Sequence, residues 1–148
     1  MSNVTEVTKE FRFCAAHRLH EYDGLCANLH GHNYHAEVTL TAAELDGMGM
    51  VLDFGIIKAR IGQWIDKHWD HALLLNANDP LASVEWDRAL GLFFKTFLFE
   101  GGHNPTAEIM AQRLWAAADG EIAGLSGVRL ACVRIYETDS SWAEVIGG

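Results

Sequence analysis

Alternating apolar and polar positions predict that β-strands begin and end the chain. Residues 5–17 show this alternation at four apolar positions of one parity, Val7, Phe11, Phe13 and Ala15, as expected of a half-buried strand. Residues 31–42 are rich in Val, Thr and Tyr and predict a second strand. Two more strands are expected near the C-terminus, at 128–137 and 141–146.

Helical spacing replaces this alternation in two central segments. Asp53 is the expected N-cap of a helix that ends near Trp69. Its core-facing residues recur at helical spacing, at Ile57, Ile61, Trp64 and Ile65. Asn104 and Pro105 are the expected N-cap and first residue of a second helix, which ends near 119–120.

The order strand, strand, helix, helix, strand, strand predicts an α+β fold. We expect a four-stranded antiparallel sheet with two helices on one face. Residues 83–99 stay ambiguous, because a helix there would be apolar all round. The length of 148 residues indicates a single domain, 1–148. Exposed edge strands need pairing, so we also expect a homo-oligomer.

Composition narrows the classes of function. Hydrophobic residues make up 49% of the chain and charged residues 21%, which is typical of a globular protein. We find no apolar run of about 20 residues and no signal-peptide pattern, so no membrane contact is expected. Three cysteines without a repeating spacing fit a reducing cytoplasm. A net charge of −9 argues against nucleic-acid binding.

A histidine pair at the start of the second strand is the strongest chemical signal. Residues i and i+2 of a strand point to the same face, so His30 and His32 can converge on one ion. His17 ends the first strand and can meet them across the hairpin. Three imidazoles with one open position describe a catalytic zinc site.

Cys26 lies four residues before His30, and its role has three interpretations. As a fourth ligand it would close the site and make the zinc structural. As a free thiol beside a cation it would have a lowered pKa and could act as a base or nucleophile. It could also be a small buried residue, although the loop around it is polar. The spacing leaves these roles open.

Two further signals are weak when taken alone. Asp70 and His71 are adjacent, and a carboxylate that orients an imidazole is a common acid–base arrangement. Glu137 closes the third predicted strand, where it could accept two N–H bonds from a 2-aminopyrimidinone edge. A helix end and a solvated strand end, respectively, would also explain these residues.

A cupin-like metal motif is the rival interpretation of the histidine pair. Gly24, His30, His32 and Glu37 have the spacing of its opening part. However, no glycine follows Glu37 at the expected position, and no later Pro-x-Gly turn supplies another histidine. Strand parity also points Glu37 away from the two histidines.

Six sequence blocks, in order, resemble the 6-pyruvoyl-tetrahydropterin and 6-carboxy-tetrahydropterin synthase family. The blocks are Phe13-Cys14-Ala15-Ala16-His17-Arg18-Leu19, Cys26-Ala27-Asn28-Leu29-His30-Gly31-His32-Asn33-Tyr34, Val51-Leu52-Asp53-Phe54, Asp70-His71 with Leu75-Asn76, Pro105-Thr106-Ala107-Glu108, and Glu137-Thr138. The resemblance implies the tunnelling fold, in which subunits join their sheets into barrels as tetramers or hexamers. Active sites of the family lie between subunits.

The resemblance also implies roles for individual residues. His17, His30 and His32 match the zinc ligands, and Cys26 matches the catalytic thiol. Asp70 and His71 match its partner pair. For the substrate, Glu137 matches the pterin anchor, and Thr106 lies in a block that lines the pterin pocket.

The Cys-x3-His-Gly-His spacing looks like the bacterial carboxy-forming branch. That branch converts 7,8-dihydroneopterin triphosphate into 6-carboxy-tetrahydropterin, acetaldehyde and triphosphate, toward 7-deazapurines and queuosine. A pyruvoyl-forming or aldolase-like pterin enzyme is the alternative, and a noncatalytic zinc- or pterin-binding subunit is a remote one. Residues 77–103 form an expected insertion relative to the short bacterial members, which leaves the substrate and the oligomeric state open.

Overall fold

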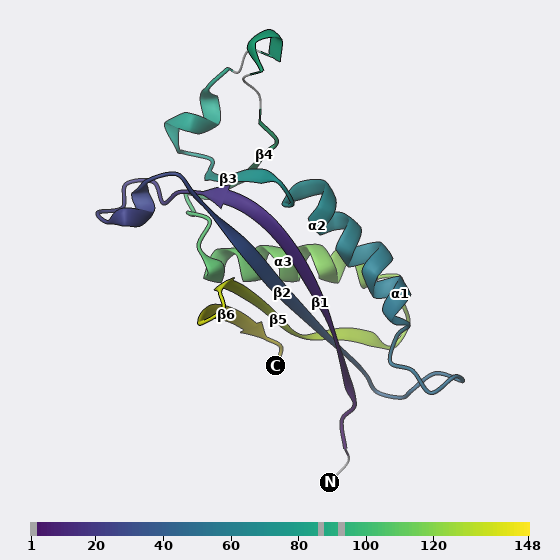
Figure 1. Ribbon diagram of the computed structural model, residues 1–148. Helices are drawn as coiled ribbons and strands as arrows, with labels where there is room; N and C mark the ends of the chain where they lie inside the picture. The colour runs from purple at the N-terminus through teal and green to yellow at the C-terminus, as the bar shows by residue number, and fades with distance from the viewer. Residues whose placement is uncertain (1–2, 86–87, 92–93) are drawn as a thin grey trace.

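The computed structural model describes residues 3–85, 88–91 and 94–148, and its strands form one sheet. The sheet has six strands in the order β4-β3-β1-β2-β5-β6 (Figure 1). The strands are β1 (Glu6–His17), β2 (His30–Ala42), β3 (Ala72–Asn76), β4 (Thr96–Phe99), β5 (Val128–Thr138) and β6 (Ser141–Ile146).

The four predicted strands are present as β1, β2, β5 and β6, and neighbours among them pair antiparallel. The prediction of a four-stranded antiparallel sheet is nevertheless wrong. β3 pairs parallel with β1, and β4 pairs parallel with β3, so the sheet is mixed. β3 is buried at all five positions, so it lacks the alternation that reveals a half-buried strand.

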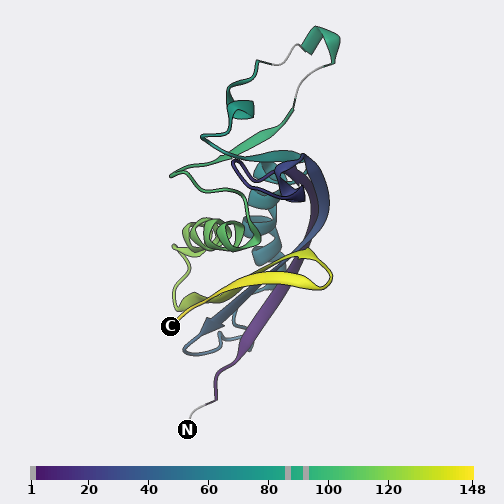
Figure 2. The same cartoon turned by 90° about the vertical axis from the view of Figure 1, so that its left-hand side faces the viewer.

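Two helical segments cover one face of the curved sheet (Figure 2). The first runs through α1 (Phe54–Ile57), the π-helical η2 (Lys58–Gly62) and α2 (Gln63–His68). The Asp53 side chain accepts a hydrogen bond from Gly55 N at 2.6 Å, which confirms Asp53 as the N-cap. The predicted first helix is therefore correct in type and extent.

The second helix, α3 (Ala107–Ile122), begins later than predicted. Thr106 is its N-cap, because the Thr106 hydroxyl accepts from Ile109 N at 3.2 Å. Asn104 instead ties two loops together: its side chain accepts from His20 N at 2.8 Å and donates to His20 O at 3.1 Å. The assignment of Asn104 as the N-cap is thus wrong, since tertiary partners take up its amide.

The core lies between the sheet and the two helices. Its buried side chains alternate along β1 and β2 and recur at helical spacing, as the sequence pattern predicts; β3, buried at every position, is the exception. The largest fully buried ones are Trp69, Tyr34, Leu40, Ile57, Ile61, Ile65, Leu74, Leu75, Met110, Leu114, Ile122 and Ile135. No helix within the described ranges is long and apolar enough to cross a bilayer.

The segment between β3 and β4 projects away from the sheet (Figures 1 and 2). It contains two short 3-10 helices, η3 (Pro80–Ser83) and η4 (Arg88–Leu90). It belongs to the expected insertion at 77–103, of which residues 86–87 and 92–93 lie outside the described part. The described part of residues 83–99, whose pattern is ambiguous, contributes η4 and β4.

A bidentate ion pair between Arg18 and Asp79 joins the end of β1 to the start of the segment between β3 and β4. Arg18 Nε donates to Asp79 Oδ2 at 2.7 Å, and Arg18 Nη2 donates to Asp79 Oδ1 at 2.5 Å. The Asp79 carboxylate is fully buried, whereas the Arg18 side chain is 26% exposed. The bond from Arg18 is the main reason that the pKa of Asp79 is lowered.

Replacing Arg18 by Ala should lower the free energy of unfolding by about 2–4 kcal/mol, because it leaves a buried carboxylate unpaired. Urea unfolding at neutral pH measures this loss of stability, and replacement of the exposed Arg129 by Ala is the control.

The lowered pKa of Asp79 makes the contribution of the pair depend on pH. The pair stabilises the fold above the usual carboxyl pKa of 3.8 and ceases to do so as the pH falls through the lowered pKa of Asp79. The difference between the variant and the parent should therefore shrink in acid. Equal loss in both variants would contradict this role.

Candidate metal centre

The three histidines proposed as metal ligands meet at one end of the β1–β2 pair. His17, the last residue of β1, lies directly opposite His30, and Ala15 lies opposite His32. Their side chains project to the helix-covered face of the sheet, where His17 is 1% exposed. The structure thus brings together the side chains that strand parity places on one face.

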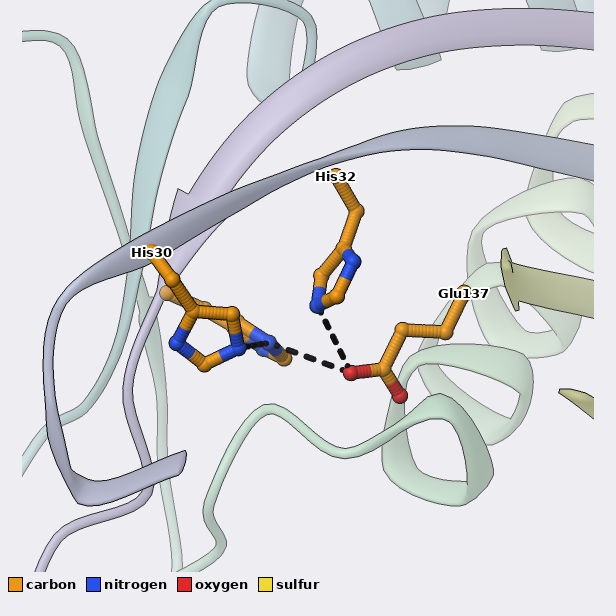
Figure 3. A group of neighbouring side chains, drawn as sticks. His30, His32 and Glu137 are labelled. Carbon is orange, nitrogen blue, oxygen red and sulfur yellow. Dashed lines mark hydrogen bonds and ion pairs between the residues drawn. The ribbon is translucent and has the colours of Figure 1, made fainter. Parts of the chain in front are cut away.

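The geometry of this cluster fits a tetrahedral cation. One ring nitrogen of each histidine and one oxygen of Glu137 lie within 4.8 Å of one another. His17 Nε2 is 3.0 Å from His30 Nε2, and Glu137 Oε1 is 2.9 Å from His32 Nε2 (Figure 3). Two nitrogens bound to a tetrahedral zinc at about 2.0–2.1 Å would lie about 3.3 Å apart. Small side-chain adjustments would therefore open a zinc-sized centre.

Backbone carbonyls orient two of the imidazoles. His17 Nδ1 lies 2.8 Å from the carbonyl oxygen of Pro105, and His30 Nδ1 lies 2.7 Å from that of Asn28. When each Nδ1–H donates to its carbonyl, the Nε2 lone pair is left free to bind a cation. Ligand orientation of this kind is common at zinc centres and has no signal in the sequence.

His32 presents a solvent-shielded nitrogen to the same space. Its Nε2 makes a 2.9 Å ion-pair contact with Glu137 Oε1. Burial is the main reason that the pKa of His32 is lowered, which favours the neutral, metal-binding form of the ring.

Glu137 meets the histidines rather than standing apart from them. Its Oε1 is also 3.4 Å from His17 Nε2, and the bond with His17 is the main reason that the pKa of Glu137 is lowered. The carboxylate therefore stays ionised and complements a cation.

A role for Glu137 in holding a pterin would require the side chain to move. The 2-amino edge of a pterin lies at the opposite end of its ring system from the C6 side chain. Glu137 would have to swing away from the histidines to hold that edge while the side chain reached the metal.

Cys26 lies next to this centre but outside the ligand cluster. It sits in the 3-10 helix η1 (Leu25–Ala27), and its carbonyl accepts from Leu19 N at 2.8 Å. Among the described residues, the cluster within mutual ligand reach does not include its Sγ. The Cys26 thiol is close enough to Tyr34 to help raise the pKa of that phenol, after burial and Glu137. This position favours a free thiol beside the centre over a fourth ligand.

Asp70 and His71 form the expected pair, but away from the three histidines. His71 Nδ1 lies 2.9 Å from Asp70 Oδ2, and the His71 side chain is 76% exposed. His71 has a φ of 60°, a conformation uncommon outside glycine that often marks functional positions. Both residues contact Cys14, whose side chain points to the sheet face that the helices leave open.

The structure also bears on two minor expectations. Thr106, expected near the pterin pocket, caps α3 directly after Pro105, whose carbonyl holds His17. Glu37 lies opposite Arg134 in the register of β2 and β5 and contacts it at 3.5 Å. It stays apart from the three histidines, so the cupin-like arrangement does not form.

Comparison with known proteins identifies relatives over nearly the whole chain. A 6-carboxy-5,6,7,8-tetrahydropterin synthase from Rickettsia conorii is 33% identical over 142 residues, covering 96% of this chain and all of that protein. The structure of 6-pyruvoyl tetrahydropterin synthase from Caenorhabditis elegans is 27% identical, with a TM-score of 0.69 and coverage of 99% of this chain and 97% of that one. A crystal structure of an uncharacterized Wolinella succinogenes protein is 25% identical, with a TM-score of 0.83, and covers 99% of this chain and all of that one.

The family comparison spans nearly the whole molecule. The sequence model of the 6-pyruvoyl tetrahydropterin synthase family matches residues 6–147, from the first residue of β1 to just beyond β6. The match therefore includes the histidine cluster, the pair Asp70–His71 and the segment between β3 and β4. This chain belongs to the 6-pyruvoyl tetrahydropterin synthase family.

Proposed function

We propose that this protein is a zinc-dependent 6-carboxy-tetrahydropterin synthase. It would convert 7,8-dihydroneopterin triphosphate into 6-carboxy-tetrahydropterin, acetaldehyde and triphosphate, in the cytoplasm and toward 7-deazapurines and queuosine. The cluster of three histidines, whose ring nitrogens and the Glu137 oxygen lie within 4.8 Å of one another, carries this proposal. The name of the Rickettsia conorii relative supports the carboxy-forming reaction over the pyruvoyl-forming one.

His17, His30 and His32 would hold the zinc ion. When bound, zinc supplies a Lewis acid that lowers the pKa of coordinated hydroxyl groups and polarises a developing carbonyl. The histidine donors and the adjacent anionic Glu137 suit a borderline-soft divalent cation. With Cys26 outside the cluster and Glu137 engaged by the pterin, a fourth coordination position would be available to the substrate.

Proton transfer would fall to Cys26 and to the pair Asp70–His71. Cys26, beside the centre, would move a proton on the substrate side chain as a thiolate. His71, oriented by Asp70 through the 2.9 Å contact, would supply or remove the second proton. Within one chain this pair belongs to the open sheet face. We therefore propose that a homo-oligomer, a tetramer or a hexamer, brings the pair of one subunit to the cluster of the next.

The reaction is tested directly by incubating the zinc-loaded protein with 7,8-dihydroneopterin triphosphate and identifying the products by mass. The proposal expects 6-carboxy-tetrahydropterin together with acetaldehyde. A pyruvoyl product would assign the chain to the other branch, and a cleaved side chain without triphosphate release would indicate an aldolase-like reaction. Binding without turnover would support a noncatalytic subunit.

Replacing Glu137 by Gln tests its proposed role as pterin anchor; Thr106 would line the same pocket. A carboxylate can accept two parallel N–H bonds from the pterin edge, whereas an amide offers one acceptor and one clashing donor. Pterin affinity should fall about ten- to a hundred-fold, the value of a buried charge-assisted bond of about 1.5–3 kcal/mol. Titration of the protein with a pterin measures this change.

Zinc content measured on the same samples separates the anchor from a ligand. As an anchor, Glu137 can be replaced by Gln without loss of zinc. Its 2.9 Å contact with His32 makes the opposite result informative, because a parallel loss of zinc would show that the carboxylate serves the metal. Unchanged pterin affinity with full zinc would place the anchor on another residue. Glu144→Gln, on the open sheet face, is the matched control.

A further inference from the structure

A thiol, an imidazole and a carboxylate meet on the sheet face opposite the histidine cluster. Cys14 Sγ lies 3.7 Å from His71 Nε2 and 4.0 Å from Asp70 Oδ1. The three potential ligand atoms lie within 4.8 Å of one another. Asp70 and His71 already have a proposed part in the reaction, but Cys14 has none.

The backbone holds these three residues together. Cys14 N donates to Asp70 Oδ1 at 3.2 Å, and the carbonyl oxygen of Cys14 accepts from His71 N at 2.7 Å. Lys95 Nζ donates to the Asp70 carbonyl at 2.7 Å and ties the same turn to the strand region beyond it. The positions of the ligand-bearing residues are therefore set before any ion arrives, which lowers the entropic cost of binding one.

The distances suit zinc. A thiolate sulfur at about 2.3 Å and an imidazole nitrogen at about 2.0–2.1 Å from a tetrahedral ion lie about 3.6 Å apart. The observed separation of Cys14 Sγ and His71 Nε2 is 3.7 Å. The Asp70 carboxylate, 2.9 Å from His71 Nδ1, orients the ring as carboxylates do at zinc centres. When the Nδ1–H of His71 donates to Asp70, the Nε2 lone pair is left free to bind the ion.

An ion can reach Cys14, Asp70 and His71 through a cavity beside them. An open cavity of about 480 Å³ is lined by Cys14 and His71 together with apolar side chains that include Leu29, Leu73 and Leu81. A third group of potential ligands, Glu10 with His35 and Glu37, is less suitable, because the guanidinium of Arg134 already lies 3.5 Å from Glu37.

We propose that Cys14, Asp70 and His71 form a second zinc site, weaker than the histidine cluster, and that its occupancy inhibits the enzyme. Binding forms a Zn–S and a Zn–N bond and releases the Cys14 thiol proton to solvent, without oxidation or reduction. The His71 nitrogen that holds zinc is no longer available for proton transfer. Only this inhibition depends on the function proposed above; the binding of zinc does not.

The test measures the number of zinc ions bound per chain of the full-length protein. Equilibrium dialysis against free zinc in the micromolar range should give two ions per chain for the parent and for Cys132→Ser, but one for Cys14→Ser. Cobalt added to the zinc-loaded protein should produce a thiolate-to-cobalt charge-transfer band in the parent that Cys14→Ser lacks. His30→Ala should lose the other ion and keep this one. A parent with one ion, or a second ion retained in Cys14→Ser, would overturn the proposal.

Activity provides the second part of the test. Excess zinc should slow the parent at least about ten-fold, since general acid–base catalysis contributes at least about a hundred-fold. Cys14→Ser should turn over like the parent at low zinc and resist the excess. Equal inhibition of both proteins would refute the regulatory part. If the parent shows no synthase activity, the metal count still decides whether the site exists.

Discussion

Replacement of His30 by Ala is expected to abolish stable zinc binding at the histidine cluster and, with it, turnover. The ring supplies one of three proposed ligands, and its Nε2 lies 3.0 Å from His17 Nε2. Loss of a second-sphere partner alone weakens metal affinity about ten- to a hundred-fold, so loss of a ligand should exceed about a hundred-fold. Metal analysis after dialysis, beside the rate of product formation, measures both effects.

The fold should survive this change. His30 is the first residue of β2, and its backbone pairing with His17 does not need the imidazole. Circular dichroism and the thermal midpoint should therefore stay close to those of the parent. His35→Ala is the matched control, since His35 lies on the same strand but faces the other side of the sheet and should leave metal content and rate unchanged. Full zinc occupancy of the main site in His30→Ala would refute the assignment.

Replacement of Cys26 by Ala is expected to leave zinc in place and to lower kcat about a hundred- to ten-thousand-fold, the usual contribution of a positioned acid or base. The thiol lies beside the centre but outside the cluster of ligand atoms. Zinc content and kcat measured on one preparation distinguish a base from a ligand, because removal of a ligand would lower both.

Cys132→Ala provides the comparison for this variant. Cys132 is also a partly buried free thiol, but it lies on β5, where its Sγ is 3.7 Å from Glu144 Oε2. It should retain the zinc and the rate of the parent. A Cys26→Ala enzyme with the parental rate would remove this thiol from the mechanism and leave the proton transfer to another group.

Part of the histidine cluster can be predicted from the local sequence pattern, and part cannot. His30 and His32 share a face because side chains alternate along a strand, and this period is readable from the residues alone. The hairpin register then places His17 opposite His30. The approach of Glu137 had no such signal. It depends on the pairing of β5 with β2, two strands that lie far apart in the sequence, for example at His35 and Tyr136.

The missed strands show a second limit. β3 is buried at every position, because β1 and β4 flank it and the core covers it, so its residues carry no alternation. β4 has four residues, too few to show a period. Parallel pairing also requires long connections, which leave no turn signal between neighbouring strands. The position of Asn104 in a loop network, rather than at a helix N-terminus, likewise depends on partners distant in sequence.

Local periodicity and residue chemistry thus determine the four long strands, the two helical segments and the three histidines. These features depend on neighbours two to four positions away, and the printed residues contain that information. Tertiary pairing decides the rest: the parallel strands, the place of Glu137 among the histidines, and the contact of Cys14 with Asp70 and His71. Such contacts arise where distant segments pack together, and no short pattern can encode the distance between them.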